Sequence, residues 1–147
     1  MVTIRALVPA DHDDWLPLWQ AYLSFYQTEL TASQTALTFY RLTDPGFPLH
    51  GAIARRDDGA AAGIVHWLPH PNTWRAGDYC YLEDLFVAPQ ERGAGTGRAL
   101  IGHVVDWARG AGCAKVHWLT SATNATARGL YDGVAADTGM VQYAVTL

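Results

Sequence analysis

Apolar residues recur along this chain with two different periods. Alternating apolar and polar positions predict a strand over residues 2–8, and two further strands are predicted over residues 50–56 and 61–68. The last two flank Asp57-Asp58-Gly59, a sequence typical of a tight hairpin turn. Further short apolar runs between turn-forming residues predict strands over residues 79–87, 115–120 and 140–146.

Four other segments carry apolar side chains at helical spacing. The first follows an acidic cluster beginning at Asp11, and its Pro17 is tolerable only in the first turn of a helix. The others are expected over residues 33–42, from the glycine-rich loop to Gly110, and from Asn124 to Thr138. Strands that flank a helical crossover imply at least one parallel pair. We therefore expect one α/β domain over residues 1–147, a mixed central sheet with helices on both faces.

Composition narrows the classes of function. The chain has 147 residues, half of them hydrophobic, which is enough for a full core. Its net charge of −4 gives no basic surface for nucleic acid, and its apolar runs are too short to span a membrane. Cys80 and Cys113 show no paired spacing, which favours reduced thiols in a cytoplasmic protein. The six histidines show no metal-ligand spacing, so no metal site is expected.

The segment from Leu82 to Ile101 carries the most specific chemical signal. A strand with two carboxylates runs through a proline turn into a glycine-rich loop that opens directly into a helix. Such a loop can present several backbone N–H groups to phosphate oxygens. No lysine follows as a P-loop requires, and Arg98 stands where a dinucleotide fingerprint needs glycine. The alternative is an ordinary strand–helix connection in which glycine serves only the turn.

Two motifs in the second half of the chain carry a family resemblance. The pattern Arg92-x-x-Gly95-x-Gly97 resembles motif A of the GCN5-related N-acetyltransferases (GNAT). The segment from Asn124 to Asp132 resembles motif B, in which an asparagine opens a helix and a tyrosine follows seven residues later. The N-terminal half resembles the family only in its order of elements. The resemblance implies a GNAT fold and acetyl-CoA as cofactor, held by Phe86, Val87, Ala88, Arg92, Gly93, Ala94, Gly95, Thr96, Gly97, Arg98 and Asn124.

The two carboxylates suggest how an amine would be activated. The run from Tyr81 to Val87 resembles diamine (spermidine/spermine) acetyltransferases, which implies that Glu83 is a water-mediated general base and that Asp84 helps to hold the amine. Adjacent carboxylates in an apolar strand are costly unless they are paired or used, and Arg75 or Arg98 could instead pair with one of them. Regular alternation would send the two to opposite faces, unless a bulge changes their direction.

The remaining predictions concern the acid, the acceptor and the assembly. Tyr131 is expected to protonate the departing thiolate, although it could simply be a core tyrosine. The acceptor is expected to be a primary aliphatic amine on a small molecule, namely a polyamine, diamine or lysine-like compound, in contact with Tyr22, Tyr26 and Glu29. The C-terminal part resembles bacterial relatives of yeast histone and polyamine acetyltransferases, so a protein lysine remains an alternative, as does a non-catalytic acyl-CoA-binding module. Some dimeric relatives complete a partner's sheet with their last strand, which implies a homodimer.

Overall fold

Five strands form one mixed sheet in the computed structural model, which describes residues 1–147. The strands are β1 (Val2–Ala6), β2 (His50–Arg56), β3 (Ala61–His70), β4 (Tyr79–Val87) and β5 (Lys115–His117), and they lie in the sheet in chain order. The first four are antiparallel, whereas β4 and β5 are parallel because α3 lies between them in the chain. The hairpin predicted at Asp57-Asp58-Gly59 joins β2 to β3, and Gly59 adopts φ +87° there.

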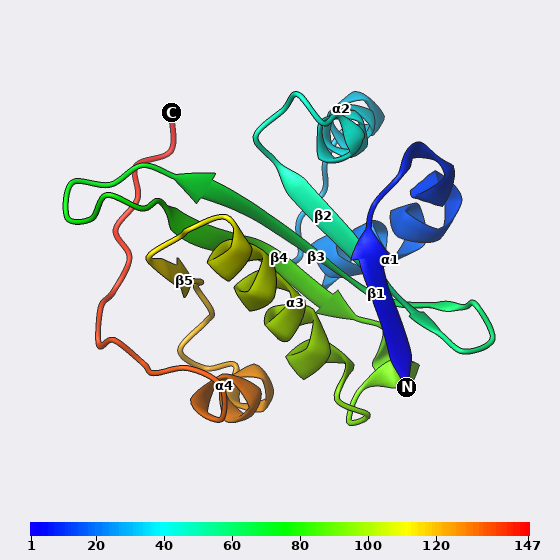
Figure 1. Ribbon diagram of the computed structural model, residues 1–147. Coiled ribbons are helices and arrows are strands. Elements are labelled where there is room, and N and C mark those ends of the chain that lie inside the picture. Colours follow the sequence, from blue (N-terminus) through cyan, green and yellow to red (C-terminus); the bar gives the residue numbers. More distant parts are fainter.

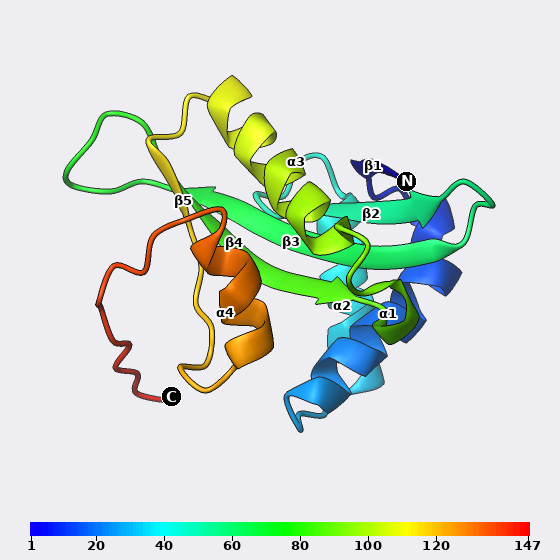
Figure 2. The ribbon, with the colours of Figure 1, turned by 90° about the horizontal axis from the view of Figure 1, so that it is seen from below.

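Helices cover both faces of this sheet. They are α1 (His12–Phe25), α2 (Ala32–Thr43), α3 (Thr96–Gly110) and α4 (Ala125–Asp132), with short 3-10 turns η1 (Pro9–Asp11) and η2 (Pro89–Glu91). Figures 1 and 2 show α1 and α2 on one face, α3 on the other, and α4 beside the β4–β5 side of the sheet. The expected mixed sheet with helices on both faces is therefore confirmed. None of the helices has both the length and the apolar character that a membrane crossing requires.

The two faces of the sheet carry separate cores. Beneath α3, side chains such as Val65 and Leu82 pack against Leu100 and Val104. On the opposite face, Ile64 and Phe86 pack with residues of α1 and α2, including Trp15, which is fully buried. This alternation of β3 and β4 residues between two cores explains why both strands read as almost continuously apolar.

Four expectations about individual elements are wrong, and one of them is the end of the last helix, because α4 ends at Asp132 and not at Thr138. The strand predicted over residues 140–146 is absent, because its apolar side chains find no strand to pair with in this chain, and Tyr143 remains 93% exposed. Pro17 lies in the second turn of α1, since that helix begins only at His12 after a 3-10 turn. β5 is shorter than predicted and ends at His117, where its pairing with β4 also ends.

Candidate active site

A cavity of about 530 Å³ lies where β4, the glycine-rich loop and the starts of α3 and α4 meet the end of α1. Most of the residues predicted from the sequence line it: Tyr22, Tyr26, Phe86, Val87, Arg92, Gly93, Gly95, Thr96, Gly97, Arg98, Asn124 and Tyr131. The structure thus brings the end of α1 together with a strand end, a glycine loop and two helix N-termini from the second half of the chain. The remaining lining residues were missed: Phe25, Leu85, Glu91, Thr126, Ala127 and Leu130.

The glycine-rich loop presents a row of free hydrogen-bond donors. None of the six backbone N–H groups from Gly93 to Arg98 donates a hydrogen bond within the protein, and Gly95 caps α3 without any side-chain hydrogen bond. Gly93 and Gly95 have φ values of +81° and +86°, a conformation that glycine adopts without strain. A Cβ at Gly97 would come within 3.0 Å of the Leu130 side chain. Unpaired N–H groups at a helix N-terminus fit the phosphates of a nucleotide-bearing cofactor.

A second set of free backbone groups lies along β4. β4 and β5 pair only from Tyr79 to Tyr81, so the rest of β4 has no neighbour on that side. The Ala88 N–H donates to the Ala62 carbonyl at 2.9 Å, and antiparallel hydrogen bonds alternate, so Leu85 and Val87 direct their backbone groups away from β3. The side chain of Arg92 donates from Nε to the Val87 carbonyl at 3.1 Å. Ala88, which was predicted to bind the cofactor, does not line the cavity; it is buried, and its N–H is already donated to Ala62.

A β-bulge places both predicted carboxylates on one face. The register of β3 and β4 shifts between His66 and Trp67, which leaves Glu83 without a partner across the ladder. Leu82 before the bulge and Leu85 after it both belong to the core under α3, so Glu83 and Asp84 both face the side of α1. Simple alternation, which would have sent them to opposite faces, does not hold here. No arginine pairs with either carboxylate; Asp84 instead hydrogen-bonds to His66.

Burial and the charge of Asp84 shift the pKa values of Glu83 and of a nearby phenol. The pKa of Glu83 is raised from its ordinary value, first by partial burial and then by the charge of Asp84. The pKa of Tyr22 is also raised, by burial first and by Asp84 second, which ties this cavity-lining phenol to the carboxylate pair. Glu83 and Asp84 do not line the cavity themselves, but the charges of both act on the Tyr22 phenol, which does line it. A carboxylate with a raised pKa is suited to proton abstraction near neutral pH.

Tyr131 projects from α4 into the cavity. Asn124 begins this helix, and its side-chain oxygen accepts a hydrogen bond from the Ala127 N–H at 3.3 Å. The Tyr131 ring lies edge-on to Trp118 with 5.4 Å between ring centroids. Burial raises the pKa of Tyr131, with a further contribution from Tyr26 at the end of α1. The phenol therefore keeps its proton at neutral pH.

Two other predicted residues lie outside the cavity. Ala94 is exposed in the glycine-rich loop, and Glu29 is exposed in the connection between α1 and α2.

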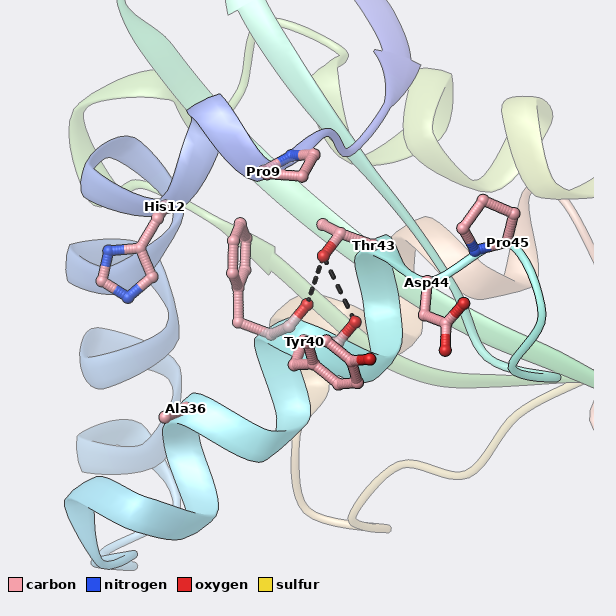
Figure 3. Close-up of a pocket in the computed structure, with 8 residues that line it drawn as sticks. Pro9, His12, Ala36, Tyr40, Thr43, Asp44 and Pro45 are labelled. Carbon is pink, nitrogen blue, oxygen red and sulfur yellow. Dashed lines mark hydrogen bonds between the residues drawn. The ribbon is translucent and has the colours of Figure 1, made fainter.

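No cluster of three or more His, Cys, Asp or Glu side chains could hold a metal ion. A separate groove of about 440 Å³ lies between the start of α1 and α2 (Figure 3), where Thr43 donates to the Phe39 carbonyl at 2.9 Å. None of the predicted site residues lines this second groove.

Comparison with known proteins assigns the family. Residues 11–133 match the Acetyltransferase (GNAT) family. The chain is 35% identical over 143 residues to the D-amino-acid N-acetyltransferase HPA3 of Saccharomyces cerevisiae, covering 97% of this chain and 89% of that protein. It is 33% identical over 86 residues to a thialysine N-epsilon-acetyltransferase of Caenorhabditis elegans, covering 58% of this chain and 52% of that protein.

Comparison with solved structures agrees with the fold that this family assignment implies. The aminoglycoside acetyltransferase AAC(6')-Iy, in complex with a CoA bisubstrate analog, superposes with a TM-score of 0.86 at 20% identity, covering 100% of this chain and 99% of that one. The chain belongs to the GNAT family and is an acetyl-CoA-dependent N-acetyltransferase. The predicted family and cofactor are thereby confirmed, and the free N–H groups of the glycine-rich loop fit the phosphates of that cofactor.

Proposed function

We propose that this enzyme acetylates a primary aliphatic amine on a small molecule by direct transfer, with Glu83 as general base and Tyr131 as general acid. The observation that carries the proposal is the bulge that turns Glu83 and Asp84 to one face, beside the unpaired part of β4 and next to Tyr22. The relatives act, by their names, on D-amino acids and thialysine, which supports a small amine-bearing acceptor.

The cofactor would be held by backbone groups along its length. The free N–H groups from Gly93 to Arg98 would bind its phosphates, and the backbone of Leu85 and the N–H of Val87 would pair with its extended arm. Acetyl-CoA supplies an activated acetyl thioester. Because hydrogen bonding alternates along β4, the Val87 N–H is better directed than that of Phe86 to polarise the thioester oxygen.

Glu83 would remove the proton that blocks the nucleophile. An alkylammonium has a pKa of about 10.4, so roughly one molecule in a thousand is nucleophilic at pH 7. A local base offsets up to about 4 kcal/mol of that cost. The raised pKa of Glu83 improves its proton affinity, while Asp84 provides a second negative charge for the ammonium group. Tyr131, still protonated at neutral pH, holds a proton available to the departing sulfur.

The test is thiol release from acetyl-CoA with a panel of amines: putrescine, spermidine, lysine, thialysine, a D-amino acid and a histone-tail peptide. We expect turnover of a free amine that falls at least about 100-fold in Glu83→Gln and in Tyr131→Phe, with acetyl-CoA affinity retained. Turnover of the peptide alone would support the protein-lysine alternative. Tight acetyl-CoA binding without turnover of any amine would favour the non-catalytic module and contradict the proposal.

We also infer that the enzyme is a homodimer, in which residues 138–147 pair with a second copy. This segment contains a short apolar run that is typical of a strand, and Val145 is 86% exposed in the single chain. A strand pattern without a partner is a template for pairing with another chain. Sedimentation analysis should give a dimer for the full chain and a monomer after truncation at Asp137; a monomeric full chain would contradict the inference.

The two unpaired thiols support the cytoplasmic location, which stays a prediction.

A further inference from the structure

A buried chain of hydrogen bonds runs from α1 through β3 to the carboxylates of β4. Trp15 donates from Nε1 to Nε2 of His66 at 3.0 Å, and Nδ1 of His66 lies 2.8 Å from Oδ2 of Asp84. Trp15 is 0% and His66 1% exposed, so water does not compete for these contacts. The pairing of His66 with Asp84 depends on the register of β3 and β4 at the bulge.

The indole fixes the tautomer of His66. A tryptophan N–H can only donate, so Nε2 of His66 must be the acceptor and carries no proton. The ring proton is then on Nδ1, from which it is donated to Asp84. His66 is thus a neutral imidazole whose two nitrogens are both engaged with protein groups.

This arrangement excludes His66 as the base that meets the substrate. In a catalytic triad the carboxylate orients a histidine whose other nitrogen faces the reacting group. Here that other nitrogen faces Trp15 in the core between the sheet and α1. The roles are therefore the opposite of those in a triad: here the histidine orients the carboxylate, and it has no free nitrogen with which to meet the substrate.

Asp84 is the group that this histidine would orient. Its side chain is 15% exposed, and Oδ2 is occupied by His66, while the Tyr22 hydroxyl that lines the cavity lies near the same carboxylate, whose charge and hydrogen bonding raise the pKa of Tyr22 after burial. Glu83 lies on the same face, and its own raised pKa reflects burial and the charge of Asp84. Neighbouring carboxylates in different environments can divide two roles, one remaining charged while the other exchanges a proton.

We propose that His66 is a positioning residue, which holds the Asp84 carboxylate in place so that it binds the acceptor ammonium beside Tyr22 while Glu83 takes the proton. The inference rests on the proposed function, since it assigns roles at the acceptor end of the same site. Trp15 supports this role, because its indole N–H donates to Nε2 of His66 and so keeps the His66 proton on Nδ1.

Three variants test the role by activity. His66→Leu removes the donor to Asp84, whereas His66→Asn keeps an N–H group near the position of Nδ1. His103→Asn, on the α3 face, is the matched control. We expect His66→Leu to lower kcat/KM for the amine by about 10- to 100-fold, with KM for acetyl-CoA within about twofold, and His66→Asn to restore most of the loss. If His66→Asn is as impaired as His66→Leu although both are folded, His66 transfers protons itself and the positioning role is overturned.

A spectroscopic measurement separates this inference from the proposed function. Imidazole nitrogen NMR on the full chain at pH 7 should show His66 protonated on Nδ1 only, and Trp15→Phe should introduce the Nε2–H form. A protonated Nε2 or an imidazolium in the wild type would overturn the inference whatever the enzyme acetylates. Conversely, an active enzyme that depends on Glu83 but is indifferent to His66→Leu would overturn the inference and leave the proposed function standing.

Discussion

Replacement of Gly95 by alanine should weaken cofactor binding by a predictable amount. Gly95 has φ +86°, and a Cβ placed there would meet no atom within 4 Å, so the substitution adds backbone strain without a clash. An L-residue in this region costs about 1–2 kcal/mol. In the free protein the loop can relax to negative φ, and binding must restore the strained conformation that aims the N–H groups at the phosphates. We therefore expect acetyl-CoA affinity to fall by about 5- to 30-fold.

Gly59 supplies a matched control for this experiment. It has φ +87° in the β2–β3 hairpin, and its Cβ would also meet no atom within 4 Å. Gly59→Ala should lower the free energy of unfolding by a similar amount and leave acetyl-CoA affinity unchanged, as measured by calorimetry. If Gly95→Ala binds acetyl-CoA as tightly as the wild type while Gly59→Ala loses stability as expected, the glycine-rich loop is not the phosphate site.

Two further predictions concern stability. The Asp11 side chain is 2% exposed and accepts hydrogen bonds from Arg5 at 2.7 Å, from Arg55 at 2.8 Å and from the Val8 N–H at 2.9 Å. These contacts lower the pKa of Asp11, and the hydrogen bond from Arg5 has the largest effect. Asp11→Asn should cost about 3 kcal/mol of unfolding free energy near pH 7; the deficit should shrink below about pH 4, where the unfolded carboxyl is protonated. An equal loss in the exposed Asp13→Asn would contradict this account. The pKa of Glu83 is raised in the folded protein, so its ionised form lowers the free energy of unfolding at high pH. Glu83→Gln should therefore raise Tm at pH 8 but not at pH 4. A lower Tm of this variant at pH 8 would show that ionised Glu83 stabilises the fold, contrary to the prediction.

Local signals predicted most of the fold. Turn chemistry located the β2–β3 hairpin, and helical spacing with Asn124 as cap located α4, because these features depend on neighbours in sequence. The segment over residues 140–146 has an equally clear strand pattern but forms none, because a strand also needs a partner. Pro17 was misjudged because the start of α1 is set by a preceding 3-10 turn rather than by the proline.

In the candidate site, too, the features that depend on neighbours in sequence were predicted, and those that depend on strand pairing were not. The glycine-rich loop is a local motif, and its residues meet at one cavity as expected. The relation between Glu83 and Asp84 depends on a register shift opposite His66, which no local pattern reveals. Helical spacing from Asn124 could have indicated Ala127 and Leu130 as further lining residues, since both fall on the same helix face as Tyr131.

The pH dependence of kcat/KM for the best amine, measured for the wild type and Glu83→Gln, tests the central claim most directly. Burial and Asp84 raise the pKa of Glu83, so the wild-type rate should fall on the acid side at a pH above the ordinary carboxyl value of about 4.3. Glu83→Gln should remove this acid limb and lower the plateau by about 10²- to 10⁴-fold. A Glu83→Gln enzyme that keeps both the wild-type plateau and the acid limb would show that another group accepts the proton.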